Sequence, residues 1–253
     1  MKYSFVICYR DRLENLKILV QNLVENIKNI DYEIIVSEQG DTEIFRRGNL
    51  RNEGARAASG DVLIFHDVDY VPADASIYFG QSTDVWLPVF AVDFLAKDMA
   101  ARSIDDTPIG YRHFHTAVDD NFFGGVICIK KESFEKMNGW STLYRGWGCE
   151  DADFGERCKY NGLSIARSTQ GRFNALYHPD SGLPLSNPEF QRNQQLLAEF
   201  KNHLGWGIKD KHHPTVISIT PELLGIDIWL KVTNFDPPPG GAETIQSSIL
   251  EDI

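Results

Sequence analysis

The chain has 253 residues, of which 42% are hydrophobic and 24% are charged, as in an ordinary globular protein. This length suits one large α/β domain, or one domain with a substantial subdomain. The net charge of −11 argues against an electrostatic grip on nucleic acid or anionic membranes, because both need a basic surface. A small anionic ligand held by a few arginines or by a metal ion stays compatible with this charge.

The cysteines and the N-terminus indicate a reducing compartment. The four cysteines show no C-x-x-C spacing and no regular framework, so we expect free thiols. The first apolar run has only seven residues, too few for a signal sequence with a cleavage site or for a bilayer span. We therefore expect a cytoplasmic location, in which any action at a membrane needs a partner.

Strands and helices alternate in the first part of the chain. Runs rich in β-branched and aromatic residues predict strands at residues 3–9, 32–39 and 61–69. Apolar residues at helical spacing predict an amphipathic helix within 10–27, and residues 49–58 suggest a second helix. This order implies right-handed crossovers and a parallel sheet.

The second half predicts a different order of elements. Residues 120–140 suggest a strand, a turn and a short helix, and 149–162 a helix with acidic residues at its start. We expect a loop at 179–188, a helix at 189–205 and one or two strands within 215–232. The tail from Pro237 is expected to be mobile.

Two carboxylates follow the third expected strand, in the stretch "IFHDVDY". Asp67 and Asp69 repel each other, and placing them at the end of a buried strand is costly. In parallel sheets, ligands bind beyond the carboxyl ends of the strands, where a divalent cation makes such a pair tolerable and can bridge a diphosphate. The alternative is a pair of strand-end aspartates that caps the next turn.

Arginines follow the first expected strand. Arg10 and Arg12 lie where a phosphate or a nucleotide would bind, and arginine offers planar, bidentate contacts to phosphate. The alternative is surface pairing with Asp11 and Glu14.

The stretch "YRGWGCEDAD" combines glycines, an aromatic residue and acids. Glycines on both sides of Trp147 let the indole face outward as a platform for a sugar ring. Glu150, Asp151 and Asp153 follow, and one of these carboxylates could act as a general base. The alternative is that they only complement a helix dipole. The sequence contains no nucleophile elbow, P-loop or G-x-G-x-x-G motif.

Taken in order, these segments resemble one family. "YRDRLENL", "SEQGDTEIFRRGNLRNEGARAA", "FHDVDYVP", "FFGGV", "MNGWSTLYRGWGCEDADFGER" and "LYHPD…NPEF" are similar to the β-1,4-galactosyltransferases, from about residue 4 to 190 with a poor match over 75–120. The resemblance implies an α/β GT-A fold with a mostly parallel sheet, an inverting mechanism, a UDP-sugar donor and Mn²⁺ or Mg²⁺. The family's animal members carry a membrane anchor and a stem. We expect neither in this sequence, and therefore expect a bacterial, cytoplasmic relative that builds surface glycans.

The resemblance also implies roles for individual residues. The general base would be Asp151, with Glu150 beside it, and the metal ligands would be Asp69 and His178. The residues implied for donor binding are Arg10, Arg12, Phe45, Arg47, Asp67, Val68, Asp69, Phe122, Gly124, Gly125 and Trp147. The residues implied for acceptor binding are Trp147, Glu150, Asp151 and Phe190.

Three positions depart from the family pattern. Ala175 stands where the family has a methionine metal ligand, so the metal needs another ligand or a water there. Ala152 replaces an acid of the acceptor site, which leaves the acceptor open. Phe122 replaces a tyrosine that discriminates galactose from N-acetylgalactosamine, which leaves the donor open.

The sequence therefore predicts a metal-dependent inverting glycosyltransferase acting on a glycan or lipid-linked acceptor. One domain would span 1–236, with a nucleotide-sugar half at 1–74, an acceptor half at 120–236 and a tail at 237–253. Two alternatives stay open, namely a catalytically weak sugar-nucleotide binding module of a polymerase complex and a nucleotide-sugar hydrolase or pyrophosphorylase.

Overall fold

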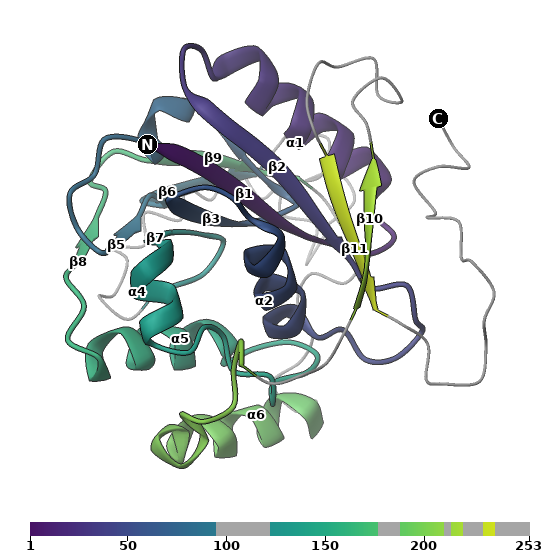
Figure 1. Ribbon diagram of the computed structural model, residues 1–253, viewed down its shortest axis with the longest axis vertical. Coiled ribbons are helices and arrows are strands. Elements are labelled where there is room, and N and C mark those ends of the chain that lie inside the picture. The colour runs from purple at the N-terminus through teal and green to yellow at the C-terminus, as the bar shows by residue number, and fades with distance from the viewer. Residues whose placement is uncertain (95–121, 177–187, 210–213, 220–229, 236–253) are drawn as a thin grey trace, which may run out of the picture.

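The computed structural model describes residues 1–94, 122–176, 188–209, 214–219 and 230–235 (Figure 1). The expected loop before Pro188 and the expected tail from Pro237 lie outside these residues. Among the described helices, none combines the length and the apolar character that a bilayer crossing requires.

An eight-stranded mixed sheet forms the centre of the fold, in the order β10-β11-β2-β1-β3-β7-β5-β8. Its central strands β1, β2 and β3 run parallel, and β11 runs parallel to β2, whereas β7 and β10 run antiparallel to their neighbours. The predicted mostly parallel α/β sheet is thereby confirmed. The strands are β1 (Lys2–Tyr9), β2 (Asp31–Glu38), β3 (Val62–Asp67), β5 (Val85–Leu87), β7 (Val126–Lys130), β8 (Ile165–Arg167), β10 (Pro214–Ile219) and β11 (Leu230–Phe235).

A second, three-stranded sheet was not predicted. It consists of β4 (Tyr70–Pro72), β9 (Arg172–Ala175) and β6 (Ala91–Phe94), in the order β4-β9-β6. Strands of three or four residues are too short to show a periodic pattern. This sheet joins the segment directly after β3 to a segment about a hundred residues further along the chain.

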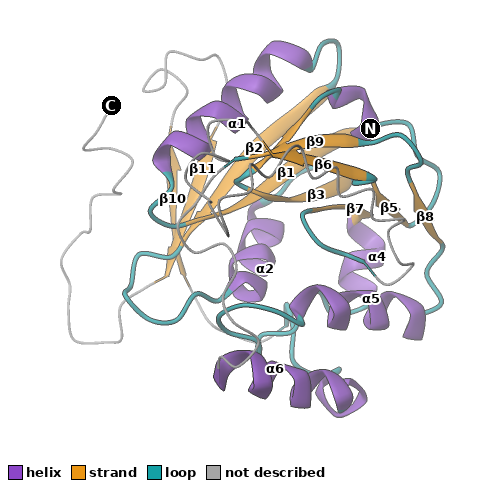
Figure 2. Ribbon diagram, turned by 180° about the vertical axis from the view of Figure 1, so that it is seen from behind, coloured by secondary structure: helices purple, strands orange, loops and turns teal. Residues whose placement is uncertain are grey.

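The helices lie on both faces of the main sheet. In Figures 1 and 2, α1 covers one face, while α2, α4 and α5 lie on the other and α6 lies beyond α5. The helices are α1 (Leu13–Asn26), α2 (Arg47–Ala57), α4 (Lys131–Lys136), α5 (Glu150–Tyr160) and α6 (Pro188–Ala198), with short 3₁₀ helices η1 (Ala75–Tyr78) and η2 (Phe200–His203).

Several predicted boundaries differ from the structure. The third predicted strand ends at Asp67, two residues before the predicted end. α2 begins at Arg47, two residues before the predicted start. β7 continues directly into α4 without the predicted turn, and the predicted helix over 189–205 ends at Ala198, followed by η2.

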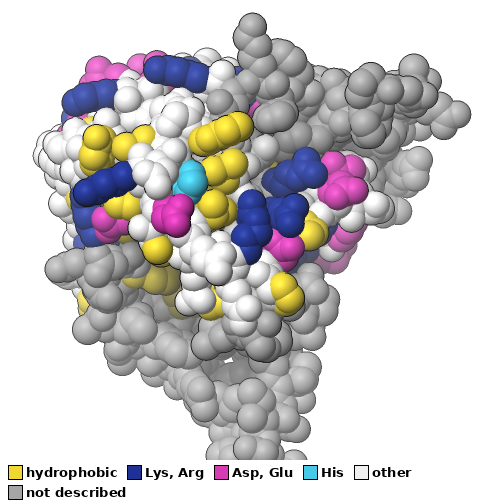
Figure 3. All heavy atoms as spheres, turned by 90° about the horizontal axis from the view of Figure 1, so that it is seen from below, with side chains coloured by type: hydrophobic (Ala, Val, Ile, Leu, Met, Phe, Trp, Pro, Cys, Tyr) yellow, Lys and Arg dark blue, Asp and Glu magenta, His cyan; other side chains and the backbone are white. Residues whose placement is uncertain are grey.

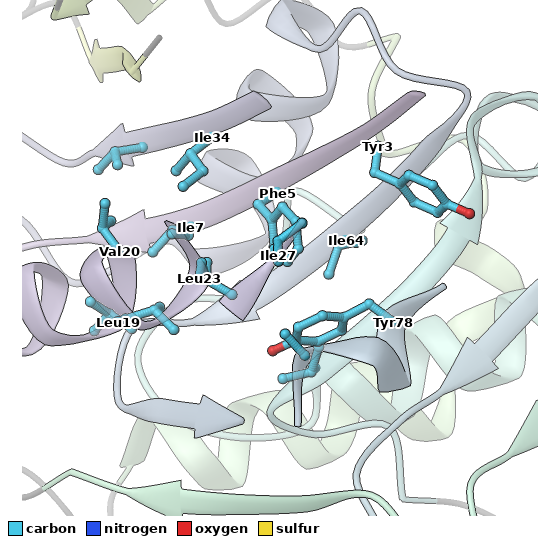
Figure 4. Close-up of a cluster of buried hydrophobic side chains, with 14 of the residues drawn as sticks. Tyr3, Phe5, Ile7, Leu19, Val20, Leu23, Ile27, Ile34, Ile64 and Tyr78 are labelled. Carbon is cyan, nitrogen blue, oxygen red and sulfur yellow. The ribbon is translucent and has the colours of Figure 1, made fainter. Parts of the chain in front are cut away.

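The central strands β1, β2 and β3 are buried on both faces. Phe5 and Ile7 of β1 point into the cluster under α1, which Figure 4 shows, whereas Val6 points toward α2. This alternation is expected of a central strand in a sheet covered on both sides. Both halves of the chain contribute to the cluster on the α2 side, where Trp140 stacks on Phe154 with ring centroids 3.9 Å apart.

Gly54 sets the distance between α2 and β1. A β-carbon at this position would clash with the Val6 side chain and lie 2.7 Å from Ser37 Oγ. The helix therefore lies as close to the sheet as a glycine permits.

We expect Gly54→Ala to lower the free energy of unfolding. Alanine favours the helix by about 1 kcal/mol over glycine, but overpacking at a tight contact costs about 1–3 kcal/mol. Equilibrium urea unfolding measures the net loss. Gly40→Ala is the control, because a β-carbon at Gly40 meets no atom within 4 Å. A Gly54→Ala protein more stable than the wild type would contradict this close packing.

Candidate active site

The site lies at the carboxyl end of the central strands. Asp67 is the last residue of β3 and lies beside Cys8 near the end of β1. Its backbone N–H donates to the carbonyl oxygen of Gly125 at 2.9 Å, just before β7 begins. Asp67 therefore lies at the edge of the sheet where the sequence predicted a ligand crevice.

Two arginines of α2 approach this carboxylate. Arg47 and Arg51 are four residues apart, which puts both on one face of the helix. Arg51 Nη2 donates to Asp67 Oδ1 at 2.9 Å, and Arg47 Nε lies 3.9 Å from the same oxygen. The opposite charges stabilise a carboxylate that would otherwise be costly at the end of a buried strand.

The same arginines reach the acids at the start of α5. Arg47 Nη1 pairs with Glu150, and Arg51 Nη1 donates to Asp151 Oδ1 at 3.0 Å. Three carboxyl groups therefore share two guanidinium groups. Glu150 and Asp151, expected as acceptor-side acids, lie directly beside the expected nucleotide-contacting Asp67.

A backbone turn and a buried ion pair define the start of α5. Cys149, the residue before the helix, has a left-handed backbone with φ 72°, which turns the chain into the helix. Within the helix, buried Asp153 accepts from Arg157 Nε at 2.6 Å. Asp153 was expected among the acids of this stretch and serves this internal pair.

Burial and neighbouring charges move the pKa values of the two aspartates in opposite directions. Burial favours a protonated Asp67, but Arg47 and Arg51 outweigh it and lower the pKa of Asp67. Burial and the charge of Glu150 raise the pKa of Asp151 to about 7, although Arg51 and Arg47 oppose the shift. Asp151 therefore changes protonation state near neutral pH, as a general base should.

The backbone of the F-G-G segment approaches Asp151. A β-carbon at Gly124 would lie 3.4 Å from Asp151 Oδ2 and 2.8 Å from the ring of Phe122. At Gly125, which has φ +76°, it would lie 2.7 Å from the ring of Tyr70. Phe122, whose backbone oxygen accepts from Arg167 Nη2 at 2.5 Å, thus lies near the expected base, as the predicted site requires.

Trp147 and Phe190 form an aromatic pair at the rim of the site. Their ring centroids are 5.1 Å apart, and Trp147 keeps 40% of its surface exposed. Asn193 Nδ2 donates to the backbone oxygens of Arg145 at 2.9 Å and of Gly148 at 3.0 Å, which fixes the loop between them. The predicted outward-facing indole is therefore present, and α6 supports it.

The expected nucleotide-binding residues lie next to this loop. The Arg10 guanidinium carbon lies 5.2 Å from the centre of the Phe45 ring. Arg10 Nη1 donates to the backbone carbonyl oxygen of Glu43 at 2.7 Å. The backbone N–H of Gly146 donates to the Phe45 oxygen at 2.8 Å. Arg12 is the residue just before α1, in the loop that follows β1.

The described residues fit a metal ion only in part. Asp69 is buried, and its backbone oxygen accepts from the Leu176 N–H at 2.7 Å. Ala175, opposite Tyr70 in the β4–β9 pair, lies near Asp69 but carries no ligand atom. His178 lies outside the described residues, and within them no three His, Cys, Asp or Glu side chains gather as a metal site. Of the two predicted metal ligands, Asp69 is therefore the one that the described residues include.

Sequence reasoning missed three residues that build the site. Arg51 was given no role, because its letter alone does not distinguish a buried arginine from a surface one. Its spacing of four residues from Arg47 could have identified it. Trp140, whose ring lies 4.1 Å from the Arg51 guanidinium carbon, and Asn193 showed no comparable signal.

The surface that carries α6 is of mixed charge. In the part of this face that the structure describes, Lys and Arg side chains lie among acidic and apolar side chains (Figure 3). On the described part of this face, no broad basic surface of the kind that nucleic acid needs is present.

Two family models match separate parts of the chain, and curated relatives match most of it. Residues 1–81 match the family model described as the N-terminal region of glycosyl transferase group 7. Residues 111–179 match the model described as the N-terminal domain of galactosyltransferase. The chain is 29% identical over 220 residues to mouse β-1,4-galactosyltransferase 5, which covers 81% of this chain and 49% of the mouse protein.

A second relative carries a different activity in its name. The chain is 31% identical over 213 residues to the β-N-acetyl-D-glucosaminide β-1,4-N-acetylglucosaminyl-transferase of Lymnaea stagnalis, over 81% of this chain and 40% of that protein. The chain thus spans about half, or less, of the length of these two relatives.

The fold is also found in solved structures. A Drosophila β1,4-galactosyltransferase 7 mutant, in complex with manganese, UDP-Gal and xylobiose, superposes with a TM-score of 0.64 at 22% identity, over 93% of this chain and 94% of that one. This likeness shows the GT-A glycosyltransferase fold. The two family models together cover more than half of the sequence, and the chain belongs to the β-1,4-galactosyltransferase family, group 7 of the glycosyltransferases.

Proposed function

We propose that the chain is an inverting glycosyltransferase that moves a hexose from a UDP-sugar to a hydroxyl group of a glycan or glycolipid. The observation that carries the proposal is the environment of Asp151. Its carboxyl group has a pKa of about 7, accepts from Arg51, and follows the exposed Trp147 by four residues. A poised base next to an aromatic sugar platform suits a transferase better than a hydrolase, which needs no surface for a second sugar.

In the proposed reaction, Asp151 accepts the proton of the acceptor hydroxyl. The hydroxyl oxygen forms the new bond at the anomeric carbon while the bond from that carbon to the diphosphate oxygen breaks, and UDP leaves with the electron pair. The proton stays on Asp151 until it passes to solvent. Arg10, stacked on Phe45, presents a guanidinium group for the nucleotide.

When bound, a divalent cation supplies positive charge against the departing diphosphate. The Drosophila relative was crystallised with manganese. We assign Asp69 and His178 as the residues that would hold the ion here. Because the Ala175 side chain offers no ligand, another residue or a water would have to complete the coordination, and both Mn²⁺ and Mg²⁺ stay candidates.

The donor sugar is proposed to be galactose or N-acetylgalactosamine. Phe122, at the position linked to discrimination at C2, lies near Asp151 and offers no hydroxyl group. The Lymnaea relative is named an N-acetylglucosaminyl-transferase, so N-acetylglucosamine belongs among the donors to be tested. A cytoplasmic location and a role in bacterial surface polysaccharide synthesis complete the proposal.

UDP release from a panel of UDP-sugars tests the function. The panel contains UDP-Gal, UDP-GalNAc, UDP-GlcNAc and UDP-Glc, with and without Mn²⁺, and simple GlcNAc, Glc and GalNAc glycosides as acceptors. We expect metal-dependent release from one donor that one acceptor stimulates. UDP release indifferent to every acceptor would indicate a hydrolase, and UTP formation from pyrophosphate a pyrophosphorylase.

One observation favours a second function. Ala175 stands at the position of the family's methionine metal ligand and has no side-chain atom that could bind a metal ion. It would suit a catalytically weak UDP-sugar binding module. Tight UDP binding by calorimetry, without turnover across the panel, would support that module and contradict the transferase.

We expect Asp151→Asn to keep UDP binding and to lower the transfer rate by about 10²–10⁴-fold, the usual contribution of general base catalysis. Rates at saturating donor and calorimetric UDP affinity are the two measurements. Glu156→Gln is the matched control, because Glu156 lies on the same helix and pairs on the surface with Lys159 at 3.1 Å. Full activity of Asp151→Asn would exclude Asp151 as the base.

A further inference from the structure

Arg51 is a buried charge that has no assigned part in the reaction. Its side chain is 1% exposed, and its Nε has no hydrogen-bond partner among the described residues. Burying a guanidinium group is costly unless its partners compensate for the lost water. Those partners are Asp67, Asp151 and the ring of Trp140.

The two carboxylates come from different parts of the chain. Asp67 ends β3, whereas Asp151 lies in the first turn of α5. Arg51 donates to Asp67 through Nη2 and to Asp151 through Nη1, at 2.9 and 3.0 Å. The planar guanidinium fixes the angle between its two amino groups, so it also fixes where one carboxylate lies relative to the other.

We propose that Arg51 is the positioning residue of Asp151: it holds this carboxyl group in place and in its charged form from an anchor on Asp67. The role in catalysis rests on the proposed function, whereas the hold on Asp151 can be measured without any reaction. The side chain stacks on Trp140, which packs on Phe154 of α5, so the guanidinium and the helix are fixed on the same ring system.

Several other groups face Asp151 and contribute to its titration. Arg47 opposes protonation together with Arg51, whereas Glu150 and Asp67 favour it. Tyr70 and Cys149 also lie within the reach of its charge. Of the two arginines, Arg51 is the one that donates a hydrogen bond to the Asp151 carboxylate, so its removal should affect Asp151 most.

The first test is a direct titration of Asp151 in the ligand-free protein. In protein labelled with ¹³C at the aspartate carboxyl groups, the Asp151 resonance is the one that Asp151→Asn removes. We expect Arg51→Met to raise the pKa of Asp151 by about one unit or more, the usual effect of losing an adjacent opposite charge. Arg56→Met, on the same helix and with the same change of charge, should leave it unchanged, because Arg56 pairs with Glu53.

The second test separates positioning from simple destabilisation. In Arg51→Met the transfer rate relative to wild type should be about fivefold lower at pH 7 than at pH 9, because a base that titrates one unit higher is less ionised at neutral pH. In an Asp151→Asn background, Arg51→Met should cause no further loss. Arg51→Lys keeps the positive charge but cannot donate to Asp67 and Asp151 through two fixed amino groups. The pKa of Asp151 should therefore stay near its wild-type value, while the transfer rate falls at every pH.

The outcomes distinguish this inference from the proposed function. An Asp151 titration unchanged in Arg51→Met, or a rate loss equal at all pH values, would overturn the positioning role. If the titration shifts but the wild-type protein transfers no sugar, the hold of Arg51 on Asp151 stands and the proposed function fails. If Arg51→Met does not fold, Arg51→Lys is the test: a lower transfer rate with a near-wild-type Asp151 titration supports positioning, and a wild-type rate overturns it.

Discussion

The repulsion between carboxylates at one edge of the sheet is the constraint on which the site depends. Asp67, Glu150 and Asp151 lie together because two arginines one helical turn apart, Arg47 and Arg51, lie between them. This arrangement requires α2 to lie close to β1, and Gly54 permits that approach. Three negative and two positive groups leave an excess of negative charge, which a cation near Asp69 would reduce.

The site is assembled from two sequence regions that lie about a hundred residues apart in the chain. The first region supplies Arg10 and Phe45, and the second supplies the loop around Trp147, which is joined to Phe45 through the Gly146 N–H. Asn193 of α6 holds the other side of that loop. The residues proposed to contact the nucleotide and the proposed sugar platform therefore share one loop framework, just before the first turn of α5.

Much of this arrangement could be predicted from the sequence, for physical reasons. The central strands carry long apolar runs, and the acids at their ends stand out because charge there is costly. The second sheet was missed because β4, β6 and β9 are too short to show a pattern. Arg51 was missed because its burial depends on tertiary packing against Trp140, and its spacing from Arg47 was the one local signal of its place in the site.

The stereochemistry of the product tests the central claim most directly. A single displacement assisted by Asp151 must invert the anomeric carbon, so an α-linked UDP-sugar must give a β-linked product. Proton NMR of the purified product reports this through the coupling of the anomeric proton, which for galactosides is large in β and small in α anomers. A β-linked product is what this account predicts, and an α-linked product would contradict it.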